Sequence, residues 1–297
     1  MSLRHFALLV VMCVIWASNN ILSKYVVSTL EVPPLFYAAA RFAILTVVLI
    51  PFLRPAPRPI WRLVVTALLM GGGTFALMFV GLKMSTPSAV SVVFQLGLPM
   101  TVLLSVLMLH ERIGLWRGFG IALTFAGVVT VIFNPQGLEF SNGLLLVAAA
   151  TFLSSLGAVM TKQIEGMRPL TFQAWVGFSS VWPLAALSAW LEPGQVDLAI
   201  AGGWPFLGAL LFSALIVSLV AHTSYVMLLQ TYEANLISAL TLMTPLITIG
   251  MGVALLGDPF GPRMAIGSAL AMSGVLIIAL RRNQVMAMLM AVRNRKR

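Results

Sequence analysis

Cysteine and charged side chains are scarce in this sequence. A single cysteine, Cys13, among 297 residues excludes an intrachain disulfide and a multi-cysteine metal site. Asp, Glu, Lys and Arg make up 9% of the chain, whereas they make up about 25% of an ordinary soluble domain. Since 60% of the residues are hydrophobic, the composition argues against a water-soluble fold.

Acidic residues are the rarest charged type, and none interrupts a long apolar run. The carboxylates are predicted to lie in loops or at the ends of such runs, and they are Glu31, Glu111, Glu139, Glu165, Glu192, Asp197, Glu233 and Asp258. We therefore expect no carboxylate in mid-membrane that could carry a proton. The net charge of +10 comes from scattered Lys and Arg without a basic face, so we expect no nucleic-acid partner.

Long apolar runs fill almost the whole chain. A helix needs roughly 20 apolar residues to cross a bilayer. The predicted fold is an all-α integral membrane protein with ten transmembrane helices, at residues 5–25, 34–53, 61–82, 87–109, 115–133, 143–163, 170–191, 204–229, 235–256 and 263–280. The first run could also be a signal peptide, but no small-x-small cleavage site follows it, so we expect a retained helix.

The distribution of Lys and Arg predicts the orientation of these spans. Cytoplasmic connections retain positive charge during insertion. Lys24, Lys83 and Arg263 fall on one predicted side, and Arg41 falls inside a span. The other side, which we predict to be cytoplasmic with both termini, collects Arg4, Arg54, Arg58, Arg62, Arg112, Arg117, Lys162, Arg168, Arg281, Arg282, Arg293, Arg295, Lys296 and Arg297.

The two halves of the chain resemble each other. Pro34 matches Pro169, and later Pro99 and Glu111 match Pro245 and Asp258. We therefore predict a five-helix repeat at residues 1–136, a second at 142–282 and a basic cytoplasmic tail at 283–297. A repeat with an odd number of spans enters the membrane in opposite directions, which gives inverted-topology halves suited to alternating access.

Polar stripes mark the first helix of each half. Trp16, Asn19 and Asn20 share one face of the first helix, and Ser154 and Ser155 share one face of the sixth. Polar groups inside a membrane face a watery cavity or hydrogen-bond to neighbouring helices. Both interpretations stay open for these residues.

A second polar pattern accompanies prolines in the fourth and ninth helices. Gln95 lies one turn before Pro99, and Thr241 lies one turn before Pro245. Proline leaves the carbonyl four residues earlier without its helical donor, which favours a hinge or a solute contact. A static kink is the alternative for both prolines.

The remaining candidates are aromatic or charged. His222 and Tyr225 share a face of the eighth helix, and Phe79 and Trp175 could line a pocket or simply pack. His222 could be a structural residue or a proton relay. The two roles can be distinguished in vesicles by whether His222→Ala keeps its full response to an imposed pH gradient.

Three cations fall near the predicted pathway. Lys24 and Lys83 lie close to helix ends, while Arg41 lies inside the second span. For Arg41 we expect pairing with carbonyls or a reach to the outer surface, with attraction of a solute carboxylate as the secondary interpretation.

Short motifs follow one another along most of the chain. They are Ile15-Trp16-Ala17-Ser18-Asn19 with Lys24, Pro33-Pro34 with Arg41-Phe42, Pro99 before His110-Glu111-Arg112, Tyr232-Glu233-Ala234, Pro245, and Gly257-Asp258. In the order and spacing of these motifs, the chain resembles the EamA-type branch of the drug/metabolite transporter superfamily. The resemblance implies ten helices around a central cavity, no cofactor, and export of amino acids or related metabolites across the bacterial inner membrane. Ala17, Asp258 and Ala221-His222 differ from the residues frequent at these positions in that family.

The leading hypothesis is a secondary transporter that moves a small polar solute, plausibly an amino acid, outward. The predicted solute contacts are Trp16, Asn19, Asn20, Phe79, Gln95, Ser154, Ser155, Trp175, His222, Tyr225 and Thr241. An exporter of cationic drugs or nucleosides, a lipid-modifying membrane enzyme, and a scaffold without flux are the alternatives. We predict no metal or cofactor, and both a monomer and a homodimer stay open.

Overall fold

The computed structural model describes residues 1–54, 58–110, 113–134, 139–161, 164, 168–232 and 234–280. Several predicted features lie outside the described residues. These are Glu111, Arg112, Lys162, Glu165, Glu233, Arg281, Arg282 and the tail at 283–297.

Ten helical spans in the described chain are long and apolar enough to cross a membrane, as the sequence predicted. Six of them run without a break in α1 (Leu3–Ser28), α2 (Pro34–Leu49) with the 3-10 turn η1 (Ile50–Leu53), α7 (Leu115–Ile132), α8 (Asn142–Thr161), α9 (Pro169–Leu191) and α15 (Pro262–Ala279). The protein is therefore a multi-pass membrane protein.

The other four spans are interrupted along their length, three by a segment of another helical type and the ninth by a turn. The third consists of α3 (Ile60–Leu68), the π-helical η2 (Leu69–Gly73) and α4 (Thr74–Lys83), and the fourth of α5 (Pro87–Val93), the 3-10 turn η3 (Phe94–Leu96) and α6 (Gly97–Leu109). The eighth consists of α11 (Gly203–Leu211), the π-helical η4 (Phe212–Ala221) and α12 (His222–Thr231), and the ninth of α13 (Ala234–Leu240) and α14 (Met243–Leu256). These interruptions fall at matching places in the two halves.

Local sequence signals explain where the spans begin and end. Proline stands in the first turn of α2, α5, α9 and α15, where its missing N–H costs nothing. The ends of α6 and α14 match each other, because His110 and Gly257 both adopt the left-handed conformation there. A short helix, α10 (Gln195–Ala201), and a two-residue strand pair, β1 (Phe133–Asn134) with β2 (Glu139–Phe140), lie in the connections.

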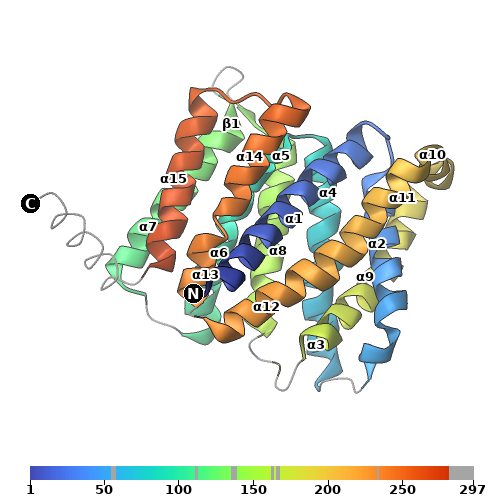
Figure 1. Ribbon diagram of the computed structural model, residues 1–297, viewed down its shortest axis with the longest axis horizontal. Coiled ribbons are helices and arrows are strands. Elements are labelled where there is room, and N and C mark those ends of the chain that lie inside the picture. Colours follow the sequence, from blue (N-terminus) through green and yellow to red (C-terminus); the bar gives the residue numbers. More distant parts are fainter. Residues whose placement is uncertain are drawn as a thin grey trace, which may run out of the picture.

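Equivalent helices from the two halves pack in pairs. In Figure 1, α7 and α15 lie together at one edge of the bundle, and α2 and α9 lie together at the other. The α7–α15 pair is close because small residues meet: a Cβ on Gly127 would overlap the backbone of Gly267 and Ala271. These pairs form the two flanks of the molecule.

The first helix of each half packs against the opposite half. Helix α1 crosses the centre of the bundle and contacts α12, η4 and α14, while α8 contacts α3, η2, α4 and α6 (Figure 1). This reciprocal packing of the two first helices is consistent with an inverted repeat.

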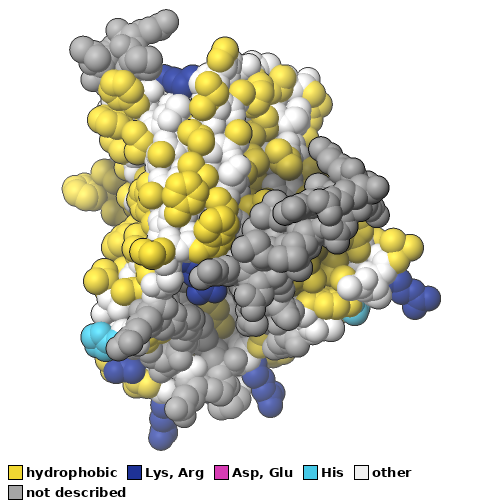
Figure 2. Space-filling view, turned by 90° about the vertical axis from the view of Figure 1, so that its left-hand side faces the viewer, with side chains coloured by type: hydrophobic (Ala, Val, Ile, Leu, Met, Phe, Trp, Pro, Cys, Tyr) yellow, Lys and Arg dark blue, Asp and Glu magenta, His cyan; other side chains and the backbone are white. Residues whose placement is uncertain are grey.

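The outer surface is suited to lipid. Figure 2 shows hydrophobic side chains over much of one face, with most of the Lys and Arg in view projecting near its lower end. Large apolar side chains such as Leu115, Trp190 and Trp204 are strongly exposed. Exposed apolar surface of this extent fits a bilayer rather than water.

Candidate solute-binding cavity

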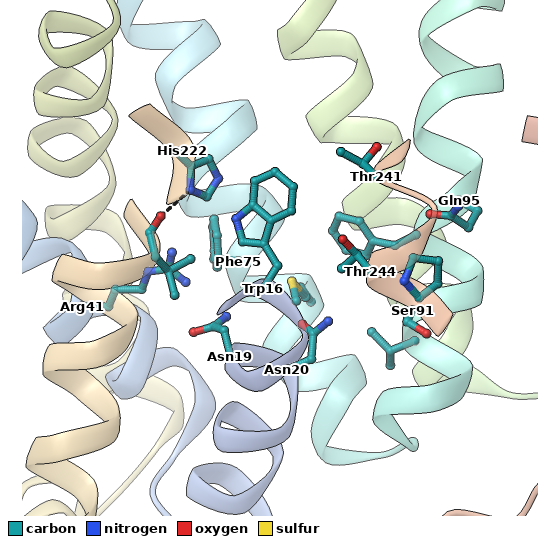
Figure 3. Close-up of a pocket in the computed structure, with 15 residues that line it drawn as sticks. Trp16, Asn19, Asn20, Arg41, Phe75, Ser91, Gln95, His222, Thr241 and Thr244 are labelled. Carbon is teal, nitrogen blue, oxygen red and sulfur yellow. Dashed lines mark hydrogen bonds between the residues drawn. The ribbon is translucent and has the colours of Figure 1, made fainter. Parts of the chain in front are cut away.

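A cavity of about 300 Å³ lies in the interior where the interrupted spans meet. Both halves contribute to its wall, and Figure 3 shows the side chains around it. Its polar lining residues are Asn19, Asn20, Arg41, Ser91, Gln95, His222, Thr241 and Thr244. The volume is at the lower end of the range for small-molecule sites.

Two prolines explain why the fourth and ninth spans are interrupted at this cavity. Pro99 and Pro245 lack the N–H that would bond to the carbonyls of Gln95 and Thr241 in a regular α-helix. The chain forms a 3-10 turn at 94–96, and the N–H of Thr244 donates to the carbonyl of Thr241 at 2.9 Å. The equivalent residues Gln95 and Thr241 both line the cavity, whereas the hinge role of the prolines stays a proposal.

Helix α1 supplies Trp16, Asn19 and Asn20 to one wall. The Trp16 ring meets the rings of His222 and Tyr225 edge-on, with centroids 5.6 and 5.4 Å apart. Neither Nε1 of Trp16 nor Oδ1 of Asn19 has a hydrogen-bond partner in the part of the chain that the structure describes. Tyr225 packs against Trp16 and does not line the cavity itself.

His222 is held by its own helix. Its Nδ1 lies 2.8 Å from the carbonyl oxygen of Val217, within the π-helical segment η4. Because a carbonyl oxygen only accepts, Nδ1 carries the hydrogen of this bond, and a neutral ring then offers Nε2 as an acceptor. His222 therefore lines the cavity while its Nδ1 is occupied by the bond to the carbonyl of Val217.

Arg41 is the one Lys or Arg among the described lining residues, and no Asp or Glu joins it there. Its side chain is 2% exposed, its Nη2 donates to Oγ of Ser218 at 3.3 Å, and its guanidinium lies 4.3 Å from the centroid of the Phe75 ring. Its Nε and Nη1 have no hydrogen-bond partner among the described residues. The expectation that Arg41 pairs with carbonyls or reaches the surface is therefore not met.

Four other predicted contacts lie away from this cavity. Phe79 is completely buried and stacks on Tyr37 at 4.9 Å, because the second span covers it. Ser155 donates to the carbonyl of Gly97 at 3.0 Å and joins α8 to α6, so the interhelical interpretation holds for this residue. Ser154 and Trp175 do not line the cavity, and Nε1 of Trp175 donates to the carbonyl of Leu53 at 3.3 Å.

The two predicted pathway lysines also lie outside the lining. Nζ of Lys24 donates to the carbonyls of Leu82 and Lys83 at 2.9 and 3.0 Å. These carbonyls end α4, so a cation there stabilises the helix terminus. The side chain of Lys83 is exposed. Both lysines are better explained by helix ends than by solute contact.

The sequence analysis missed several lining residues. Met78, Val90 and Val217 line the cavity but carry no polar signal that separates them from core residues. Thr244 could have been found, since it lies three residues after Thr241 and therefore on the same helical face.

An acidic side chain joins the two halves at one end of the bundle. Asp258, after α14, accepts hydrogen bonds from the backbone N–H of Ser88 at 3.0 Å and from its hydroxyl, at the start of α5. A carboxylate at a helix N-terminus is stabilised by the helix dipole. In Figure 1, α5 and α14 lie side by side at this end. We call this contact the Ser88–Asp258 latch.

A family model described as "EamA-like transporter family" matches residues 4–133 and again 141–280. The chain belongs to the EamA-like transporter family. The two matches together cover nearly all of the described spans, one match for each half. The resemblance noted in the sequence is thus confirmed for the EamA family.

Curated relatives carry names that concern export. A Salmonella typhimurium protein (strain LT2) named "Probable amino-acid metabolite efflux pump" is 27% identical over 281 residues, covering 91% of this chain and 92% of its own. An Escherichia coli K12 protein of the same name is 24% identical over 287 residues, covering 93% and 95%. A solved structure titled "Crystal structure of protein" has a TM-score of 0.55 and 19% identity over 93% of this chain and 96% of its own, which supports the fold alone.

Proposed function

We propose that this EamA-family protein exports a small polar metabolite of the amino-acid class across the bacterial inner membrane. The observation that carries the proposal is a cavity that both halves of the bundle line, with polar side chains gathered in its wall. Polar groups are costly inside a membrane unless they serve a solute, water or each other. The names of the two enterobacterial relatives support the same solute class.

Transport is proposed to occur by alternating access. The supporting features are the reciprocal packing of α1 and α8 on the opposite halves and the interrupted helices beside the cavity. In inverted-repeat carriers, one half rocks against the other around a fixed site. The positive charges at the connections support cytoplasmic termini, and with that orientation the Ser88–Asp258 latch would lie toward the outside.

The charge of the cavity disfavours the cationic-drug alternative. Arg41 puts a positive charge in the described lining, and no acidic side chain there balances it. An organic cation would meet repulsion at short range in a medium of low dielectric constant. A zwitterionic or anionic solute fits this wall better.

Flux measurements in proteoliposomes test the proposal. Purified protein is reconstituted, vesicles are loaded with single radiolabelled L-amino acids, and release is followed beside protein-free vesicles and vesicles loaded with the D-enantiomers. We expect saturable, stereoselective movement of at least one amino acid. Release at the protein-free rate for every amino acid would contradict the proposal.

A further inference from the structure

The guanidinium of Arg41 is built into the wall of the cavity with unused donors. Four features fix its place: nearly complete burial, the bond from Nη2 to Ser218, the ring of Phe75 4.3 Å away, and the position in the lining. Ser218 in turn donates to the carbonyl of Ser213 at 3.3 Å. The cation is thus oriented by the second and eighth spans, one from each half.

The unused donors form a fork. Nη2 carries two hydrogens, one facing the same side as Nε–H and the other the same side as Nη1–H. Ser218 takes one hydrogen of Nη2, and both Nε and Nη1 lack a partner among the described residues. Whichever hydrogen Ser218 takes, one pair of parallel N–H groups remains. Such a pair matches the two oxygens of a carboxylate.

The charge also lacks a counter-ion. No Asp or Glu lines the cavity in the described part of the chain. An unpaired buried charge is costly, and an incoming anion lowers that cost. A buried cation at the cavity wall therefore favours a solute that brings its own negative charge.

The polar residues around the cavity lie in two groups. In Figure 3, Arg41, Asn19 and His222 lie at one side, whereas Gln95, Thr241 and Thr244 lie at the other. The indole of Trp16 lies between them. A solute held at Arg41 thus extends toward uncharged hydrogen-bonding groups at the interruptions of the fourth and ninth spans.

We propose that Arg41 is the carboxylate-binding residue of this transporter, so that the solute is recognised by a free carboxylate next to its α-carbon. This inference rests on the proposed function and specifies its solute class. The oxygens of the carboxylate accept from the free N–H fork of Arg41. Oδ1 of Asn19, which has no partner in the described chain, accepts from the α-ammonium group.

Binding of matched ligand pairs tests this inference without a mutant. Thermal shifts of the purified full-length protein are titrated with the amino acids that move in the flux assay, with their carboxamides, and with the decarboxylated amines. Benzoate and benzamide form a pair without an ammonium group. We expect the acid of each pair to bind roughly 10- to 100-fold more tightly than its neutral partner.

Substitutions of Arg41 test whether this residue causes the preference for the acid over its neutral partner. Arg41→Gln is expected to remove the preference for the acid, and Arg41→Lys to keep part of it, because lysine supplies the charge without the fork. Lys83→Gln is the matched control, since it removes a cation that is exposed and outside the lining. It should keep the full preference.

The outcomes separate this inference from the proposed function. Equal binding of acid and amide by the unaltered protein, or an unchanged preference in Arg41→Gln, would overturn the role of Arg41 even if amino acids move. Binding of benzoate without benzamide, in a protein that moves no amino acid, would keep the role of Arg41 and end the amino-acid proposal. If no acid probe binds, the role of Arg41 is overturned, and if no amino acid moves either, the proposed function is overturned with it.

Discussion

Several of the buried polar atoms that lack a partner in the described chain lie at the cavity. Trp16, Asn19 and Arg41 each present a buried nitrogen or oxygen without a partner in the described chain, and all three line the same space. Leaving such a group unpaired costs about 1–3 kcal/mol. This free-energy cost is offset only if a solute or water supplies the missing hydrogen-bond partners. The unpaired atoms therefore support the proposed function.

Asn19 and Ser154 make a matched pair for testing individual residues. Both are polar and were predicted to contact solute, but only Asn19 lines the cavity. Asn19→Ala is expected to weaken solute binding by roughly 3- to 30-fold, because it removes an unpaired acceptor. Ser154→Ala should bind as the unaltered protein does. Ligand titration by thermal shift measures both, and equal losses in the two variants would contradict the assignment.

The limits of sequence reasoning are clearest for equivalent residues. Polar stripes on α1 and α8 look alike in the sequence, yet Asn20 lines the cavity whereas Ser155, its equivalent, bonds to the carbonyl of Gly97. Either outcome satisfies a polar group, and only the tertiary packing decides between them. Phe75 and Phe79 also lie on one helical face, but Tyr37 covers only the second.

At the scale of elements, the long apolar runs were the most dependable indicators of structure. Apolar runs and helix-starting prolines located the ten spans within a few residues, because the bilayer demands long apolar helices. The π-helical segments η2 and η4 were not predicted, since they depend on contacts such as that of Gly72 N–H with Ser180 Oγ at 2.7 Å. Tertiary contacts of this kind leave no pattern in the sequence.

The close packing of α7 on α15 predicts the effect of enlarging Gly127. Gly127→Leu places bulk against the backbone of Gly267 and Ala271, and overpacking of this kind costs about 1–3 kcal/mol. We expect the melting temperature of the purified protein to fall by several degrees. Gly118→Ala in the same helix is the control, because a Cβ there meets nothing within 4 Å. A similar drop in both variants would show that the helix pair is not the cause.

The interruption of the ninth span predicts an effect of Pro245 on movement. Pro245→Ala restores an N–H that can bond to the carbonyl of Thr241 and so favours a continuous helix. Solute flux should fall several-fold while solute binding changes less. Pro183→Ala provides the comparison, since Pro183 lies inside the continuous helix α9 and away from the cavity. Normal flux in Pro245→Ala would remove the hinge proposal.

At the scale of the whole molecule, the two halves meet at the cavity and are held at one end by the Ser88–Asp258 latch. The latch joins α5 of the first half to α14 of the second. A carrier that alternates must separate these helices to release solute on that side. The strength of the latch should therefore set how often this end opens.

Thiol labelling can measure that opening. In a background with Cys13→Ser, a cysteine replacing Ser91 reports access to the cavity, which Ser91 lines. Asp258→Ala removes the acceptor for both bonds from Ser88, and we expect the rate of labelling by a membrane-impermeant maleimide from the outside to rise several-fold. Asp197→Ala removes another acid of the connections and should leave the rate unchanged. A faster rate in both variants would assign the effect to surface charge instead.

Filling the cavity tests the central claim most directly. Thr244 lines the space of about 300 Å³ between the two halves, and Thr244→Trp places an indole there. Counterflow of the transported amino acid into proteoliposomes is measured for this variant and for the unaltered protein at equal reconstituted amounts. The account predicts that uptake falls to the level of protein-free vesicles in Thr244→Trp. Undiminished uptake through a filled cavity would show that the solute takes another route.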